Sequence, residues 1–157
     1  MQVIAQKSLR IRHRRSEDDP FIARLAARAF AEYDGHPMVT MERLTQRGVT
    51  WIACRGEAPV GFAVVHPLDR NSADLCAIAV EEDFRGLGIG RALLAHVERA
   101  AISAGHKELR LHTAQANLSA LELFLNWGFR VSERRPRFYR GVYDACALVK
   151  RMTPLHR

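Results

Sequence analysis

Three glycines and two arginines lie close together at residues 85–91, Arg-Gly-Leu-Gly-Ile-Gly-Arg. This segment follows an apolar run at residues 75–80 and leads into an amphipathic stretch at residues 91–104. Glycines let backbone N–H groups crowd around an anion, and the first turn of a helix adds unpaired donors and a favourable dipole. The pattern predicts a pyrophosphate cradle at a strand-to-helix turn, although glycines also serve ordinary tight turns.

Two common nucleotide-binding motifs do not fit these glycines. No Gly-Lys-Ser/Thr follows them, which excludes a Walker loop. A dinucleotide fingerprint belongs to the first strand–helix–strand unit, whereas this segment comes after about 80 residues of other structure. Its position therefore favours another kind of nucleotide ligand.

A second segment, residues 117–129, follows the next apolar stretch. Asn117 is a helix-capping residue type, and Gly128 followed by Phe129 is typical of a helix end. The side chains expected to point inward are Ala120, Leu121, Phe124 and Leu125. Alone, this segment predicts no more than a helix that ends in glycine.

Together, the two segments resemble the GNAT superfamily of acetyl-CoA-dependent N-acetyltransferases. The family motifs are Arg/Gln-x-x-Gly-x-Gly/Ala and a later Asn-x-x-Ala with an aromatic residue and Gly-Phe downstream, matched here from Arg85 and from Asn117. Closest in pattern are the enzymes that acetylate the N-terminal alanine of ribosomal proteins. The resemblance covers residues 11–149 and implies a single N-acetyltransferase domain over residues 1–157, with a core at about 9–150 and a short basic C-terminal tail.

The resemblance also implies an α/β fold. Its sheet is mixed but mostly antiparallel, with roughly six or seven strands flanked by about four helices, and splayed between the two central strands. Hydrophobic periodicity and turn residues predict the same succession of elements. Strands are expected at residues 9–12, 49–54, 60–65, 75–80, 109–113, 129–133 and 145–149. Helices are expected after Ser16 or Asp18, at 41–47, at 91–104 and after Asn117, with a long loop before residue 145.

The family's cofactor contacts can be carried over to this chain. Its backbone amides would hold the pyrophosphate of acetyl-CoA at Arg85, Gly86, Leu87, Gly88, Ile89, Gly90 and Arg91. The main chain of Ala79 and Val80 would pair with the pantetheine arm, and the Val80 N–H would stabilise the oxyanion of the transition state. Asn117 would reach the pantetheine or the phosphate side of the coenzyme.

Two positions depart from the nearest family pattern in residues that move protons. His112 stands where the ribosomal-protein enzymes carry a base glutamate; an ordinary imidazole pKa of about 6.5 suits a base, but a histidine on the polar side of a strand needs no such role. Phe124 stands where they carry a tyrosine acid, so it would pack against the pantetheine or the core. Tyr139, Tyr143 or water could replace the acid, with substrate contact the favoured role for Tyr139.

The acceptor is expected to be a small-molecule or peptide amine. Asp74, near the start of the central strand, could bind that amine directly or through water, although strand-end carboxylates are usually just solvated. Tyr33 and the short helix at residues 35–48 would form the other side of the acceptor cleft. These residues do not identify the acceptor.

Composition is typical of one folded domain, with 157 residues, 48% apolar and 26% charged. The formal net charge of +7 suits an anionic partner such as coenzyme A. RNA, an acidic protein surface or a solvated basic face would fit it too, but no RNA-stacking motif is present and nucleic acid is not an expected partner. Both a solvated surface and a wall for an acidic acceptor stay open for Arg134, Arg135, Arg137 and Arg140.

Cysteine content and hydropathy restrict the cellular compartments expected for this chain. Cys54, Cys76 and Cys146 form no C-x-x-C pair and have no histidine at ligand spacing, so we expect reduced core cysteines and no metal. No apolar run reaches membrane length and the N-terminus lacks a secretory pattern, which predicts a cytoplasmic protein with no membrane partner. An exposed last strand leaves a homodimer open.

Two other classes of function are compatible with the sequence besides an acetyltransferase. A module of the same fold could bind acetyl-CoA as a sensor without turnover, an alternative that Phe124 motivates. A basic RNA- or ribosome-associated protein is the more remote alternative, and a steep salt dependence of RNA binding is the least it must show.

Overall fold

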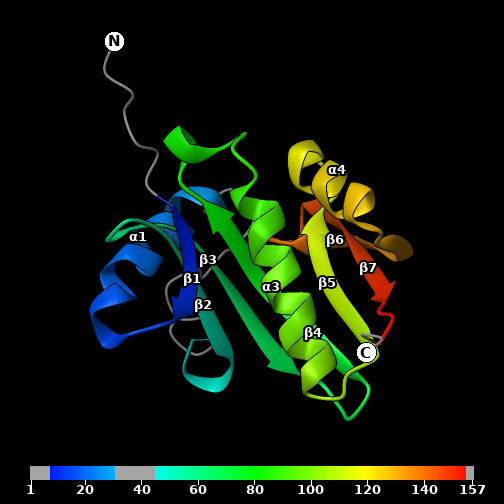
Figure 1. The fold of residues 1–157 in the computed structure, drawn as a ribbon. Coiled ribbons are helices and arrows are strands. Elements are labelled where there is room, and N and C mark those ends of the chain that lie inside the picture. The colour runs from blue at the N-terminus through cyan, green and yellow to red at the C-terminus, as the bar shows by residue number, and fades with distance from the viewer. Residues whose placement is uncertain (1–7, 31–44, 155–157) are drawn as a thin grey trace.

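The computed structural model describes residues 8–30 and 45–154 as strands, helices and connecting turns (Figure 1). The strands are β1 Leu9–His13, β2 Val49–Arg55, β3 Ala58–Pro67, β4 Ser72–Val80, β5 Glu108–Ala114, β6 Arg130–Tyr139 and β7 Tyr143–Arg151. The α-helices with described bounds are α1 Asp19–Phe30, α3 Ile89–Ser103 and α4 Leu118–Trp127. Residues 45–47 are helical, and the rest of the helix expected at 41–47 lies outside the described residues.

All seven strands form one mixed sheet in the order β1-β2-β3-β4-β5-β7-β6. The central pair, β4 and β5, is parallel and the other neighbours are antiparallel. The parallel register covers only Ser72–Asp74 against Glu108–Arg110, so the two strands part after Asp74. This confirms the mixed fold and the splay expected between the central strands.

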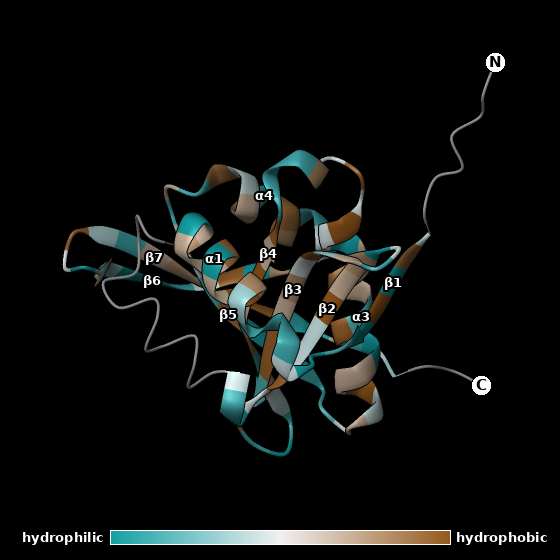
Figure 2. Ribbon diagram, turned by 90° about the vertical axis from the view of Figure 1, so that its left-hand side faces the viewer, coloured by the Kyte–Doolittle hydropathy of each residue, from teal (hydrophilic) through white to brown (hydrophobic). Residues whose placement is uncertain are grey.

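Helices cover both faces of the sheet and divide the core in two. The larger apolar cluster joins α3 and α4 to one face, with Leu93, Leu94 and Phe124 at its centre. The smaller cluster joins α1 to the other face through Phe21, Ile22 and Leu25, as the sequence predicts. In Figure 2 the apolar colour is concentrated on the central strands, between the helix layers.

A bulge in β4 changes which residues face each helix layer. Leu75 lies opposite Val65 and Ala77 opposite Val64, which leaves Cys76 as the extra residue. An extra residue moves every later side chain to the opposite face. Leu75 accordingly belongs to the α3 cluster, whereas Ala77 belongs to the α1 cluster.

The last hairpin is longer than expected, because residues 134–139 extend β6 instead of forming a loop. The hairpin turns at Arg140-Gly141, where both residues have positive φ (54° and 68°) and the Val142 N–H donates to Tyr139 O at 3.0 Å. Positive φ at both central residues is the hairpin-type turn. The sequence hides this strand because β6 is an edge exposed along nearly its whole length, so no apolar alternation marks it.

Local sequence signals predict both ends of α4 but not the start of α1. Asn117 caps α4, since its side chain accepts from the Ala120 N–H, and Gly128 ends the helix at φ 113°. Leu125, expected to point inward, is 44% exposed because it lies one residue round the helix from the buried Phe124. Neither Ser16 nor Asp18 caps α1 directly: a 3₁₀ turn, Ser16–Asp18, precedes the helix.

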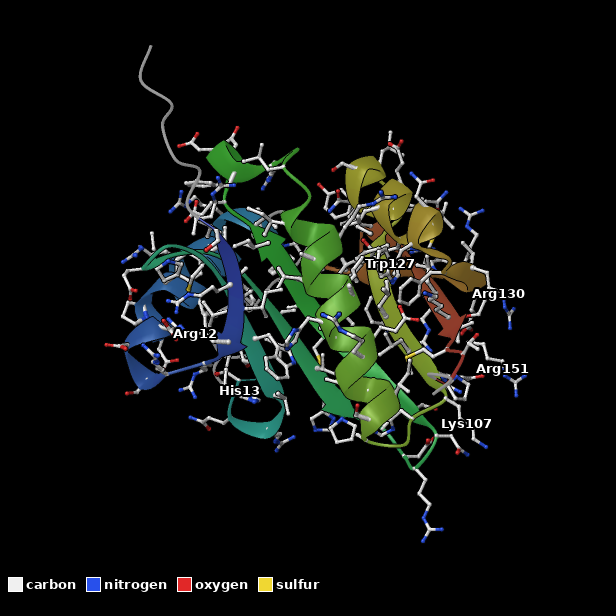
Figure 3. All side chains as sticks on the ribbon, viewed as in Figure 1. Arg12, His13, Lys107, Trp127, Arg130 and Arg151 are labelled. Atoms are coloured by element: carbon white, nitrogen blue, oxygen red, sulfur yellow. The ribbon has the colours of Figure 1, made fainter. Side chains whose placement is uncertain are left out.

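Asp18 instead ties that turn to the sheet. It is 3% exposed and accepts two hydrogen bonds from the Arg12 guanidinium (2.8 and 3.0 Å) and one from the Arg15 N–H (2.7 Å). Arg12 reaches it from β1 (Figure 3). The hydrogen bonds from Arg12 hold the pKa of Asp18 below its ordinary value, and they outweigh the opposing effect of burial.

Replacing Asp18 by Asn should lower the free energy of unfolding at pH 7 by about 2–3 kcal/mol, because Arg12 would lose a buried charged partner. Since the folded-state pKa is lowered, this stabilisation is present above the ordinary carboxylate pKa of about 4 and is lost as the pH falls through the folded value. Urea unfolding at pH 7 and at pH 3 measures both effects. Asp19→Asn, which removes an exposed partner of Arg14, is the matched control and should cost under about 1 kcal/mol; equal losses for the two variants would contradict the assignment.

Candidate active site

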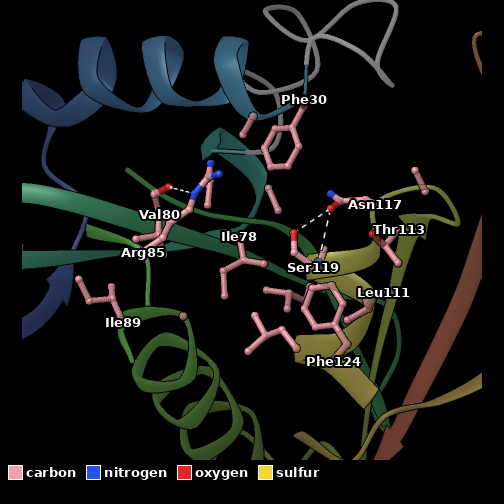
Figure 4. A pocket seen from close by; sticks show the side chains of 18 of the residues that line it. Phe30, Ile78, Val80, Arg85, Ile89, Leu111, Thr113, Asn117, Ser119 and Phe124 are labelled. Atoms are coloured by element: carbon pink, nitrogen blue, oxygen red, sulfur yellow. Dashed lines mark hydrogen bonds between the residues drawn. The ribbon is translucent and has the colours of Figure 1, made fainter. Parts of the chain in front are cut away.

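A cleft of about 780 Å³ lies where β4 and β5 part. Its lining comes from the ends of these strands, the first turn of α3, the inner face of α4 and the end of α1 (Figure 4). Of the residues predicted for the cofactor, the lining includes Ala79, Val80, Arg85, Gly86, Gly88, Ile89, Gly90, Arg91, Asn117 and Phe124. Leu87 is not among them and is 58% exposed.

Backbone N–H groups gather at the start of α3. Gly86 and Gly88 have φ of 77° and 83°, and a Cβ at either would meet no atom within 4 Å, so glycine is needed there for its conformation. The first bond of the helix runs from the Ala92 N–H to Gly88 O at 3.0 Å. The N–H groups of residues 89–91 precede that bond, so the helix itself supplies no acceptor for them. This arrangement fits an anion at the helix start.

Gly90 has a different role from the other two glycines. Its φ is not positive, and a Cβ there would come 3.4 Å from Leu123 Cδ2 of α4. The absence of a side chain thus allows α3 and α4 to approach closely beside the cleft. Spacing alone does not distinguish this packing role from the turn roles of Gly86 and Gly88.

The main chain of β4 faces the cleft at every second residue. The Glu81 N–H donates to Val60 O at 2.8 Å, and Val80 lies opposite Gly61 in the register. Because antiparallel partners alternate between bonded and non-bonded pairs, the N–H and C=O of Val80 point away from β3, toward the gap. By the same alternation, the N–H and C=O of Ala79 point toward β3, whereas those of Ile78 point toward the gap. No sequence motif marks Ile78.

The Arg85 side chain hydrogen-bonds one of the two main-chain groups that Val80 turns toward the gap. Its Nε donates to Val80 O at 3.2 Å, as the dashed line in Figure 4 marks. The carbonyl of Val80 is therefore engaged. Its N–H is the group left to face the cleft, the donor that the resemblance predicts for an oxyanion.

Asn117 and Phe124 line the cleft from the β5 side. The Asn117 Oδ1 accepts from the Ala120 N–H and from the Ser119 hydroxyl, each at 3.4 Å. Only the Asn117 side-chain NH₂ thus remains to donate to a ligand. Phe124 is 4% exposed and packs edge-to-face on Phe129 at 5.8 Å, so it forms an apolar part of the wall.

His112 stands on β5 with its ring stacked on Phe138 of β6, at 5.3 Å between centroids and 9° between planes. Partial burial, followed by the positive charge of Arg135, lowers the pKa of His112 below its ordinary value; Asp74 and Glu133 oppose this shift. This direction favours the neutral imidazole at pH 7. A neutral imidazole can accept a proton, so the protonation state suits a base.

Asp74 and Cys76 form a second polar pair near His112. The Cys76 thiol lies 3.4 Å from Asp74 Oδ2, to which it donates. Burial, followed by the charge of Asp74, raises the pKa of Cys76 to about 12, and burial raises the pKa of Asp74. Cys76 lines the cleft and Asp74 does not, so the expectation of three plain core cysteines holds for Cys54 and Cys146 but is wrong for Cys76.

The cleft is also lined by the end of α1 and by the last hairpin. Tyr139 of β6, which the sequence offers as a substrate contact, belongs to this lining, as do Arg28, Ala29 and Phe30 of α1. Phe30 points into the cleft in Figure 4, and no motif marked it in advance. Tyr33 lies outside the described residues.

Part of the positive charge of the chain lies at the cleft, where Arg28, Arg85 and Arg91 belong to the lining. Lys107, Arg130 and Arg151 project from the end of the sheet where β4 and β5 are still paired (Figure 3). Arg134 and Arg135 on β6 are ion-paired with Asp144 and Glu133. Arg134, Arg135, Arg137 and Arg140 are not part of the cleft lining, which favours the solvated surface over a wall of the acceptor cleft for these four.

Within residues 8–30 and 45–154, no group of three or more His, Cys, Asp or Glu side chains is placed to hold a metal ion. No helix in the same ranges is long and apolar enough to cross a bilayer.

Comparison with known proteins gives a family and several relatives. Residues 15–129, more than half of the chain, match the model of the Acetyltransferase (GNAT) family. N-acetyltransferase 8B of Rattus norvegicus is 32% identical over 98 residues, which span 59% of this chain and 44% of that protein. The uncharacterized N-acetyltransferase MJ1530 of Methanocaldococcus jannaschii is 28% identical over 93 residues, 59% of each chain. The chain spans about half the length of the curated relatives it matches.

Solved structures share the fold. A GNAT family acetyltransferase from Elizabethkingia anophelis with acetyl-CoA bound aligns with a TM-score of 0.80 and 22% identity, covering 92% of this chain and 98% of that one. The ribosomal-protein-S18-alanine N-acetyltransferase from Escherichia coli aligns with a TM-score of 0.81 and 23% identity, covering 96% and 97%. These likenesses establish the architecture.

An NMR titration of the His112 ring should give a midpoint below 6.5, the ordinary imidazole value. Asp74→Asn should lower that midpoint further, because a negative neighbour is removed, and Arg135→Ala should raise it. Opposite movements in the two variants are the expected signature. Movement in the same direction, or a wild-type midpoint above 6.5, would contradict the proposed electrostatic environment of His112.

Proposed function

Because the chain belongs to the acetyltransferase (GNAT) family, we propose that it transfers the acetyl group of acetyl-CoA to a primary amine. The amine attacks the thioester carbonyl directly, and the reaction passes through a tetrahedral intermediate. The observation that carries the proposal is the gap between β4 and β5, which has the glycine turn and the start of α3 at one end and the His112 imidazole on its wall.

The donor half of the cleft is built mainly from backbone. The N–H groups at the start of α3 would hold the pyrophosphate, where glycines admit it closely. The pantetheine arm would lie along β4 and bond the main chain at Ile78, with the Asn117 NH₂ as a side-chain donor. The Val80 N–H would then polarise the acetyl carbonyl and stabilise its oxyanion.

Proton transfer falls to side chains on the β5 and β6 side. His112 would take a proton from the ammonium or from the attacking amine, directly or through one water. Phe124 has no hydroxyl to protonate the leaving thiolate. We assign that role to Tyr139, which lines the cleft, or to water, and a substrate contact is the other use of Tyr139.

Two features support a cationic amine as the acceptor, whether a small molecule or a peptide. Asp74 does not line the cleft itself, but it puts a carboxylate near His112. Burial raises its pKa, and a bound ammonium nearby would favour the charged form of the carboxylate. The Escherichia coli enzyme of the same fold is named for a protein N-terminal alanine, so a peptide N-terminus is a natural first candidate. Tyr33 remains a predicted contact on the opposite side.

A second candidate function rests on one observation. Phe124 is buried at the position where the nearest family pattern has a tyrosine acid, and a module without that acid could bind acetyl-CoA only as a sensor. Thiol release with a panel of amines and peptides separates the two. A sensor binds the coenzyme and releases no thiol above background.

Acetyl-CoA at about 100 times its Kd should raise the unfolding free energy by about 2.7 kcal/mol and raise the Tm accordingly. Gly88→Asp should abolish that shift, because it adds negative charge and a strained φ at the cradle. Gly105→Asp is the matched control: Gly105 also has positive φ (93°) in open space, but at the far end of α3. Arg134→Ala should keep the full shift. No shift of the wild type at millimolar acetyl-CoA would rule out the cofactor.

His112→Ala should lower kcat/KM by about 100-fold and remove the acidic limb of its pH profile, because the base is lost. His106→Ala, at the turn after α3, should leave both unchanged. Free thiol, followed with the best acceptor of the panel, is the measurement. An unchanged pH profile in His112→Ala would reject His112 as the base.

A further inference from the structure

The strands β6 and β7 are out of register near the end of their hairpin. Between the pairs Arg135–Ala145 and Tyr139–Tyr143, three residues of β6 lie opposite a single residue of β7, Asp144. Extra residues of this kind bend a strand and redirect its side chains. We call residues 136–138 the β6 bulge.

The β6 bulge contains a backbone conformation that its sequence does not favour. Arg137 has φ of 52°, in the left-handed region, which costs free energy for a residue with a Cβ. The Asp144 Oδ1 accepts a hydrogen bond from the Arg137 N–H at 3.0 Å. That bond satisfies the backbone donor and opposes a return of Arg137 to an extended conformation.

Asp144 also links the β6 bulge to the segment that leads into α4. Its carbonyl accepts from the Gln115 N–H at 2.9 Å. The Arg134 guanidinium lies 3.7 Å from Asp144 Oδ2 and donates to Gln115 Oε1 at 2.6 Å. The carboxylate of Asp144 therefore stands at the junction of β5, β6 and β7.

The position of the β6 bulge decides what His112 meets. It carries Phe138, which stacks on the imidazole, and it precedes Tyr139, which lines the cleft. Phe138 is 46% exposed, so packing in the core does not hold the stack. The ring also contacts the Arg135 guanidinium, 5.7 Å from its centre, and the Tyr139 ring, edge-to-face at 5.0 Å. Both contacts come from β6 itself, so the backbone of the β6 bulge sets where the stack forms.

We propose that Asp144 is a positioning residue for the acceptor side of the cleft. Through its hydrogen bond to the Arg137 N–H it fixes the β6 bulge, and the fixed bulge keeps Phe138 on His112 and Tyr139 in the cleft. The inference rests on the proposed function only for its activity readout.

His112 reports on this arrangement without any turnover. The charged groups that face it are Asp74 from β4 and Arg135 and Glu133 from β6. When the Asp144 hydrogen bond to the β6 bulge is lost, we expect the Phe138 ring to leave the His112 imidazole and Arg135 to move away from it. The ring-current shift of the His112 ring protons then disappears, and their titration midpoint rises toward 6.5.

The experiment compares Asp144→Ala with Asp144→Asn by NMR of His112 and by kcat/KM. Asp144→Ala should lose the ring-current shift and about tenfold in kcat/KM, since the acceptor side is no longer held. Asp144→Asn keeps an oxygen for the Arg137 N–H, so it should retain the shift and stay within about threefold of wild type. Glu57→Ala, which removes an exposed carboxylate paired with Arg10 in the β2–β3 turn, is the control for loss of a surface charge and should change neither.

A rescue variant tests the route through Arg137. Glycine adopts positive φ without strain, so Arg137→Gly in the Asp144→Ala background should restore much of the ring-current shift. An Asp144→Ala protein with unchanged His112 signals overturns the proposal, and so does a lost stack that Arg137→Gly leaves unrestored. Where circular dichroism shows that Asp144→Ala does not fold, loss of the stack in Asp144→Asn overturns it and retention supports it. Absence of thiol release in the wild type would defeat the proposed function alone, because the NMR readout needs no turnover.

Discussion

The site depends on one constraint, the short pairing of β4 with β5. Three residues on each strand hold the sheet together at one end, and beyond Asp74 the strands part. Backbone N–H and C=O groups need partners, and a strand that loses its neighbour presents them to whatever enters the gap. A ligand that supplies donors and acceptors along an extended arm, as pantetheine does, can take the place of the missing strand. The cleft therefore follows from sheet geometry before any side chain is considered.

The two walls of the gap are held together by a polar link away from it. Glu98 of α3 accepts from the Trp127 indole of α4 at 2.9 Å and from Lys150 of β7 at 2.9 Å, and Lys150 lies 5.1 Å from the centre of the Trp127 ring. The Glu98 and Lys150 side chains are only 15% and 19% exposed, so water screens the pair weakly. The link joins the helix on the β4 side to the elements on the β5 side. The Glu98–Trp127–Lys150 link thus connects the two sides of the cleft in addition to the strand pairing.

One half of the cleft is lined mainly by main-chain groups and the other mainly by side chains. The half proposed for the donor consists of glycine backbone, the start of α3 and the main chain of β4. The half proposed for the acceptor consists of side chains on β5, α1 and the end of β6, and the charges of Asp74 and Arg135 both act on His112 there. A backbone cradle recognises any pyrophosphate, whereas exposed side chains on an edge hairpin set the charge and shape that an amine meets.

The sequence by itself determined the features that depend on neighbouring residues. The glycines before α3, the Asn117 cap, the Gly128 stop and the apolar periods predicted most elements to within a few residues, and the paired motifs led to the family. Only the tertiary structure decided which groups face the cleft. The bulge at Cys76 sends Ile78 rather than Ala79 to the gap and brings a cysteine into the lining, and the β6 bulge places Phe138 on His112. The physical reason is register: pairing partners lie far apart in the chain, and one inserted residue moves every later side chain to the other face.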